Sequence, residues 1–278
     1  MDGRVLGVLG VGLVDPDTPL LRVDDLGVLR GDGCFETLRV RDGVVAGFDL
    51  HLARLGHSAA RLDLPAPDVA AWQALVGQMV AAWTGPGEAS LRLTLTRGVE
   101  GTGVPTAFAL MTPVSDTVLA QRRDGISVVT LNRGMPADVH EDTPWLLGGV
   151  KTISYAVNMA ALRHAHQVGA DDVIFVSTDG QVTEGPTSTV VWAQADHLCT
   201  TPTTLGILDG TTLRTLFERA PAHGFTTEVR RATVADLHAA DAVWLLSSVR
   251  VVARVNVLDG RERGDAGLTA RVRAALGL

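Results

Sequence analysis

The sequence predicts a mixed α/β fold organised in two compact units. The chain has 278 residues, of which 46% are hydrophobic, so it is long enough to bury a substantial core. Alternating apolar patterns typical of strands occur beside helical patterns in both halves. Residues 113–123 are polar and show neither pattern. We therefore expect a smaller unit over residues 1–113, a linker over 114–124 and a larger unit over 125–278.

The first half is expected to begin with strands and to hold two helices. Phe35, Thr37 and Arg39 alternate with Glu36, Leu38 and Val40, which predicts a strand with two different faces. Asp49 is a suitable N-cap for the first helix. The expected elements are a strand pair in 1–14, strands at 29–40, 44–48, 89–97 and 107–111, helices at 50–62 and 69–83, and a glycine-rich loop at 98–103.

The second half is expected to alternate strands with helices. Residues 132–144 form a long loop rich in glycine, proline and charge, which is typical of a segment that closes over a site. Thr178-Asp179-Gly180 is a turn signal between two strands. The expected elements are strands at 126–131, 171–177, 181–184, 188–193 and 242–246, and helices at 156–167, 213–220 and 268–276.

Composition argues against several classes of protein. The net charge is −7 and the arginines are scattered, which disfavours a nucleic acid or an acidic membrane surface as partner. No signal peptide or long apolar run is present, and Cys34 and Cys199 are not in a metal-binding spacing. His164 and His166 would point to different faces of a helix. We expect a cytoplasmic protein without a metal site.

Lys151 and Glu184 are hard to explain as ordinary surface charges. An apolar, glycine-bearing approach precedes Lys151, so the ammonium should lose hydration and its pKa should fall. Glu184 ends the return strand of the predicted hairpin, just before Gly185 and Pro186. Such a lysine suits imine chemistry with an aldehyde, and such a carboxylate can keep a pyridinium nitrogen protonated. Taken singly, each residue is more often solvated; together they indicate pyridoxal phosphate.

Three motifs match a known family in order and separation: KTISYAVNMAAL from Lys151, VTEGPTS from Val182 and GILDGTTLR from Gly206. They resemble the class IV aminotransferases, the fold-type IV pyridoxal phosphate enzymes. The resemblance extends from about Asp24 to about Asp259. It implies a smaller N-terminal α/β sandwich domain, a larger C-terminal pseudo-barrel domain that binds pyridoxal 5'-phosphate, and a homodimer.

The resemblance also implies which residues hold the cofactor. Arg54, in a His-x-x-Arg-Leu segment, resembles the arginine that binds the phosphate, and Ser247 and Ser248 resemble further phosphate ligands. Thr211 and Thr212 open a predicted helix, whose backbone donors suit an anion. Tyr155 could reach the cofactor's phenolic oxygen, although a core or interface position is equally compatible with its place in the sequence.

The reaction implied begins with imine exchange at Lys151 and proton abstraction by the released amine. Thr37 resembles the threonine of the lyases in this family. Phe35 and Thr102, by contrast, stand where D-amino-acid transaminases have a tyrosine and an arginine, and Thr189 stands where asparagine is usual. Because a substrate carboxylate needs a cation, Arg30 and Arg97 are the candidates.

We therefore predict an aminotransferase acting on D-amino acids and 2-keto acids, with (R)-amines as further donors to consider. The alternative is 4-amino-4-deoxychorismate lyase, which releases pyruvate and 4-aminobenzoate. A cofactor-binding protein without catalysis is disfavoured because Lys151 and Glu184 are both present.

Overall fold

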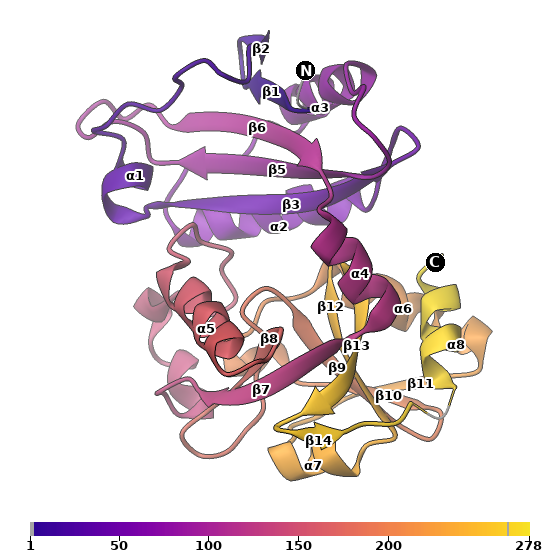
Figure 1. The fold of residues 1–278 in the computed structure, drawn as a ribbon. Helices are drawn as coiled ribbons and strands as arrows, with labels where there is room; N and C mark the ends of the chain where they lie inside the picture. The colour runs from indigo at the N-terminus through magenta and orange to yellow at the C-terminus, as the bar shows by residue number, and fades with distance from the viewer. Residues whose placement is uncertain (1–2, 266) are drawn as a thin grey trace. The chain divides into compact units, whose positions relative to one another are not determined.

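The computed structural model describes residues 3–265 and 267–278. The chain forms two compact units, and both are discontinuous in sequence. The first unit is Met1–Ser115 together with Val150–Tyr155. The second is Asp116–Gly149 together with Ala156–Leu278. The two units confirm the mixed α/β fold expected from the sequence (Figure 1).

The first unit contains an antiparallel sheet of six strands in the order β2-β1-β6-β5-β3-β4. Its strands are β1 (Val5–Val8), β2 (Gly12–Val14), β3 (Gly33–Arg41), β4 (Val44–Val45), β5 (Ala89–Thr96) and β6 (Thr106–Pro113). Its helices are α1 (Leu26–Arg30), α2 (Phe48–Arg61) and α3 (Val69–Ala81). Leu38 and Leu91 from the sheet pack with Leu55 of α2 and Trp72 of α3 in one buried core. The face of β3 that carries Leu38 is therefore the helix-covered face.

A short segment around Lys151 extends this sheet beside the first half of β3. The Phe35 N–H donates to the Lys151 carbonyl at 3.0 Å, and the Ile153 N–H donates to the Gly33 carbonyl at 2.9 Å. Cys34 and Thr152 form an isolated β-bridge between these two bonds. The backbone of Lys151 is thus fixed by residues more than a hundred positions earlier in the chain.

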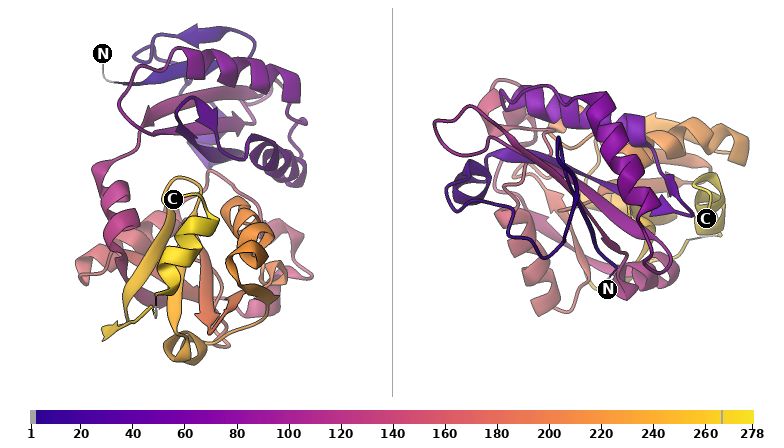
Figure 2. Two further views of the ribbon diagram at one scale, coloured as in Figure 1. Left: turned by 90° about the vertical axis from the view of Figure 1, so that its right-hand side faces the viewer. Right: turned by 90° about the horizontal axis from the view of Figure 1, so that it is seen from above.

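The second unit contains an eight-stranded mixed sheet in the order β11-β10-β9-β12-β13-β7-β8, with β14 paired to β13. Its strands are β7 (Ile126–Asn132), β8 (Asp172–Val176), β9 (Thr189–Gln194), β10 (His197–Thr200), β11 (Thr226–Val229), β12 (Ala242–Ser247), β13 (Val251–Leu258) and β14 (Arg261–Glu262). Its helices are α4 (Asp116–Asp124), α5 (Ala156–Gln167), α6 (Thr211–Arg219), α7 (Val234–Ala239) and α8 (Leu268–Ala275). Helix α8 packs beside α6 over the buried residues Leu216, Trp244 and Val272 (Figure 2).

Several local expectations differ from the structure. Residues 116–124 form helix α4 rather than an irregular linker, and Arg122 on this helix is buried and donates to the Val249 and Arg250 carbonyls. Helix α2 begins at Phe48, capped by Gly47 at φ 62° rather than by Asp49. The return strand at 181–184 is reduced to isolated bridges. Within the described ranges, no helix has the length and apolar character needed to cross a membrane.

Candidate active site

The side chain of Lys151, the chain's single lysine, lies against two aromatic rings of the first unit. Its Nζ is 4.6 Å from the centre of the Phe35 ring and 5.8 Å from that of Tyr155. The two rings meet edge to face with centres 5.2 Å apart. The Lys151 N–H also donates to the Ser58 Oγ of α2 at 3.1 Å. Sheet pairing and ring contacts together hold this amine in one place.

Thr37 lies on the same face of β3 as Phe35, two residues along the strand, and is partly buried. Its register partner on β5 is Arg92. The Arg92 Cζ lies 3.8 Å from the centre of the Phe35 ring, a close cation–π contact. We did not expect Arg92 in the site, because only the β3–β5 register brings it beside Phe35.

Arg54 is held by a buried carboxylate on the opposite face of β3. Glu36 accepts hydrogen bonds from the Arg54 Nε at 2.7 Å and from the Arg54 Nη2 at 2.8 Å. The His51 Nδ1 lies 2.6 Å from the same carboxylate. Burial by itself would raise the pKa of Glu36, but the hydrogen bonds from Arg54 and His51 outweigh it and lower that pKa to about 2. Glu36 is therefore ionised at neutral pH and orients the guanidinium that the family resemblance led us to expect at a phosphate.

Glu184 lines a pocket in the second unit together with Arg133, His140, Ser177 and Ile207. The Leu208 N–H donates to one carboxylate oxygen of Glu184 at 3.0 Å, which fixes the direction of the side chain. The next glycine is required by packing, because a Cβ on Gly185 would lie 2.3 Å from the Ser188 Oγ. The carboxylate predicted at a strand end thus belongs to a residue that lines a pocket.

The predicted phosphate ligands of the second unit lie at two element ends. Thr211 and Thr212 are the first residues of α6, and the N-cap Gly210 has no side chain to satisfy the first backbone N–H groups. Ser247 ends β12, and Ser248 follows it in a partly buried turn. The buried Ser188 Oγ has no hydrogen-bond partner among the described residues. Donor groups of this kind suit an anionic group.

The two arginines expected to bind a substrate carboxylate lie in different surroundings. Arg97 is engaged at all three guanidinium nitrogens, with the Asp32 carboxylate at 2.6 Å and 3.2 Å and with the Leu62 and Asp63 carbonyls at 2.5 Å and 3.3 Å. Arg30 is the exposed last residue of α1. The structure brings neither of them to the Phe35 ring by any contact among the described residues.

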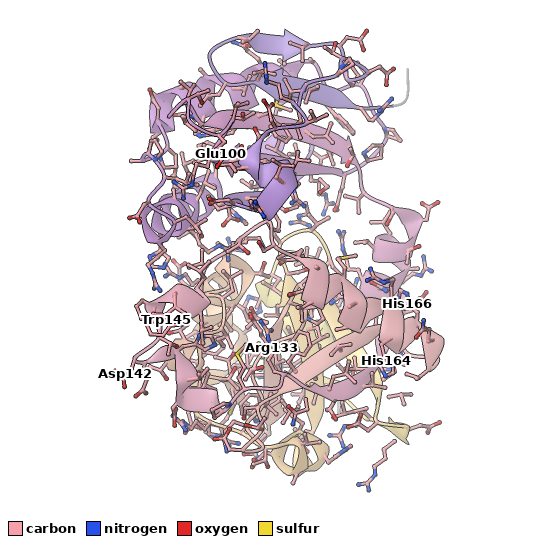
Figure 3. The ribbon with its side chains drawn as sticks, turned by 90° about the vertical axis from the view of Figure 1, so that its left-hand side faces the viewer. Glu100, Arg133, Asp142, Trp145, His164 and His166 are labelled. Atoms are coloured by element: carbon pink, nitrogen blue, oxygen red, sulfur yellow. The ribbon has the colours of Figure 1, made fainter. Side chains whose placement is uncertain are left out.

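The loop between β7 and α5 carries exposed polar and aromatic side chains. Arg133 stands near its start, and Asp142 and the 71% exposed Trp145 lie farther along it (Figure 3). His164 and His166 are both exposed on α5. In the described part of the chain no three His, Cys, Asp or Glu residues are gathered as a metal site would require.

Comparison with known proteins identifies the family of the chain. The family model described as amino-transferase class IV matches residues 33–258. A bifunctional aminodeoxychorismate lyase / D-amino acid transaminase of Mycobacterium tuberculosis is 49% identical over 270 residues, covering 94% of this chain and 91% of that protein.

Two solved structures are similar over nearly their whole length. A hypothetical aminotransferase from Mycobacterium tuberculosis in a PLP-bound form has a TM-score of 0.96 at 46% identity, covering 99% of this chain and 97% of that one. The fold IV-transaminase CpuTA1 from Curtobacterium pusillum has a TM-score of 0.93 at 44% identity, covering 99% of both chains. This chain belongs to the class IV aminotransferase family and has the fold of its fold-type IV members.

Proposed function

We propose that the protein is a pyridoxal phosphate-dependent aminotransferase that moves amino groups between D-amino acids and 2-keto acids. The observation that carries the proposal is the Lys151 amine, the chain's single lysine side chain, held against Phe35 and Tyr155. The 49% identical relative, which is named a D-amino acid transaminase as well as a lyase, supports the same substrate class.

The residues of the chain suit pyridoxal phosphate in three respects. Arg54 offers a guanidinium oriented by Glu36, the start of α6 offers backbone N–H groups to which the N-cap Gly210 gives no side-chain acceptor, and the Ser188 Oγ is buried without a partner among the described residues. Glu184 supplies a carboxylate, fixed by the Leu208 N–H, for the pyridine nitrogen. Ser247 and Ser248 are proposed as further donors to the phosphate, and Tyr155 as a donor to the phenolic oxygen.

Each residue would then have a distinct chemical task. Bound pyridoxal phosphate supplies an electron sink for a substrate carbon that loses a proton. Lys151 takes that proton on Nζ and returns it, which requires the amine to stay close to the substrate carbon. Glu184 holds a proton on the pyridine nitrogen by electrostatic stabilisation. Phe35 and Tyr155 position Lys151 and limit access of water to its amine.

A second activity, release of pyruvate and 4-aminobenzoate from 4-amino-4-deoxychorismate, is favoured by Thr37. This threonine lies on the Phe35 face of β3, the face that carries the contacts of Lys151. Its hydroxyl is available there for proton transfer to a leaving group. The relative that bears both names supports two activities on one chain.

The test uses the fact that Lys151 is the chain's only lysine. Borohydride reduction in the presence of pyridoxal phosphate should add the cofactor's mass to the peptide that contains Lys151, and D-alanine with 2-oxoglutarate should give pyruvate. The matched variant Lys151→Arg keeps the positive charge but removes the reactive amine, so it should lose both the added mass and the transamination. Labelling of the N-terminal amine alone, or unchanged turnover by Lys151→Arg, would sink the proposal.

We also propose that the protein is a cytoplasmic homodimer that acts on small molecules. Support for the dimer comes from exposed apolar side chains in the first unit around α1. Val23 is 86% exposed and Val104 is 66% exposed, and Val28 and Leu29 on α1 are also exposed. Such a group of side chains is typical of a protein–protein interface.

A further inference from the structure

A substrate carboxylate in a buried site requires a cation, and the first unit offers one that the sequence did not single out. Arg92 lies on β5 opposite Thr37, and its guanidinium stacks 3.8 Å from the centre of the Phe35 ring. The Nζ of Lys151 lies 4.6 Å from the centre of the same ring. One aromatic side chain therefore positions two cations.

Arg92 differs from the other arginines of the first unit in what it contacts. Arg54 is bound to Glu36, Arg97 to Asp32 and Arg39 to Glu88. No hydrogen bond or ion pair joins Arg92 to a carboxylate within residues 3–265 and 267–278. Its side chain is accessible to an incoming molecule, although burial by its surroundings lowers its pKa. A partly desolvated guanidinium with an open planar edge is suited to bidentate binding of a carboxylate.

The remaining candidates explain this role less well. Arg97 would have to give up its bonds to Asp32, Leu62 and Asp63 before it could bind another anion. Arg30 is exposed at the end of α1 and makes no ring contact with Phe35 among the described residues. Of these three arginines, Arg92 is the one that combines an open guanidinium with a position beside the ring that Lys151 contacts.

We propose that Arg92 binds the α-carboxylate of the substrate, whereas Lys151 acts on the neighbouring carbon. The proposal rests on the function proposed above and names its specificity determinant. An α-amino or α-keto acid carries its carboxylate one bond from the reacting carbon. Two cations beside one ring can therefore meet both groups: Arg92 the carboxylate and Lys151 the reacting carbon. An amine without a carboxylate gains nothing from Arg92.

The experiment compares donors with and without a carboxylate in the half-reaction in which the donor passes its amino group to the bound cofactor and leaves as a keto compound. The change in the cofactor's absorbance follows the reaction. Arg92→Gln should raise the KM for D-alanine about 10- to 100-fold, the range expected for a lost hydrogen bond to a charged group. The KM for a carboxylate-free (R)-amine should change less than about threefold by the same reasoning. Arg92→Lys keeps the charge without the planar fork and should fall between the two.

A binding measurement and two matched variants complete the test. Calorimetry should show that Arg92→Gln loses affinity for pyruvate but not for its neutral analogue pyruvamide. Arg30→Gln should bind pyruvate like the parent protein, whereas Arg97→Gln should lower thermal stability with little change in this selectivity. A parent KM for D-alanine in Arg92→Gln would overturn the assignment. A parent protein that fails to turn over D-alanine would instead overturn the proposed function, so the two failures are distinguishable.

Discussion

Glu36 shows how the neighbours of a buried side chain set its charge state. The carboxylate is fully buried, yet two contacts from Arg54 and one from His51 keep it ionised. Burial is also the main cause of the lowered pKa of His51, so the imidazole is neutral at physiological pH and donates from Nδ1 to Glu36. The group therefore carries one negative and one positive charge, and these balance each other.

This balance predicts a loss of stability in acid. The pKa of Glu36 is about 2 in the folded protein, below its ordinary value of 4.5. The contribution of Glu36 to the free energy of unfolding is therefore complete above pH 4.5 and is lost as the pH falls towards 2. Glu36→Gln should remove this part of the pH dependence. It should also lower the free energy of unfolding at pH 7 by roughly 3–5 kcal/mol, because the largely buried Arg54 loses the negative charge that its guanidinium binds. Urea unfolding between pH 3 and pH 7 measures both effects, and parallel curves for the two proteins would contradict the assignment.

At the scale of elements, the start of α6 combines two kinds of donor. Gly210 leaves the first backbone N–H groups without a side-chain cap, and Thr212 adds a hydroxyl in the first turn. One turn later, the Thr215 hydroxyl donates to the Thr211 carbonyl within the helix. The same helix therefore offers both a test position and an internal control.

Thr212→Val should weaken binding of pyridoxal phosphate about tenfold, which corresponds to one lost hydrogen bond. Binding of pyridoxal, which lacks the phosphate, should stay unchanged because the hydroxyl would have no group to meet. Thr215→Val should leave both affinities at the parent value. Fluorescence titration of the cofactor-free protein with each compound gives the comparison; an equal loss for both compounds would show that Thr212 does not meet the phosphate.

At the scale of the whole molecule, the exposed apolar group around α1 predicts association. Sedimentation should give about twice the chain mass of 29.3 kDa for the parent protein. Replacing Val28 and Leu29 together by lysine should shift the protein towards the monomer, because charged side chains are disfavoured in the core of an interface. Val44→Lys, at a 67% exposed position on β4, is the matched control and should remain dimeric. A parent protein that sediments as a monomer would refute the dimer.

Local patterns in the sequence predicted much of the fold. Helix α5 spans Ala156–Gln167 as expected, and the alternation of Phe35 and Leu38 correctly assigned the two faces of β3. Helix α4 was missed because its polar sequence gives no apolar periodicity, and its buried Arg122 donates to carbonyl groups of a turn more than a hundred residues later. The parts of the fold that local patterns did not predict depend on contacts between residues far apart in the sequence.

In the candidate site, too, local motifs predicted some residues, whereas long-range contacts determined others. The motifs around Lys151 and Glu184 identified the chemistry, since they are short and contiguous. The choice among arginines depended instead on how β3 pairs with β5 and on what Asp32 already binds. A register between strands more than fifty residues apart cannot be read from local spacing, which is why Arg92 was overlooked.

The pairing of residues 151–153 with β3 has a consequence for synthesis of the chain. Residues up to Ser115 leave the ribosome before Lys151, so the edge of β3 at Gly33–Phe35 is at first without its partner. At 5–20 residues per second, the missing segment follows after roughly two to seven seconds. An open strand edge invites pairing with other chains during that time. When residues 151–153 pair with β3, the strand edge is covered and Lys151 is brought to its place. The same pairing therefore removes the risk of aggregation and positions the reactive amine.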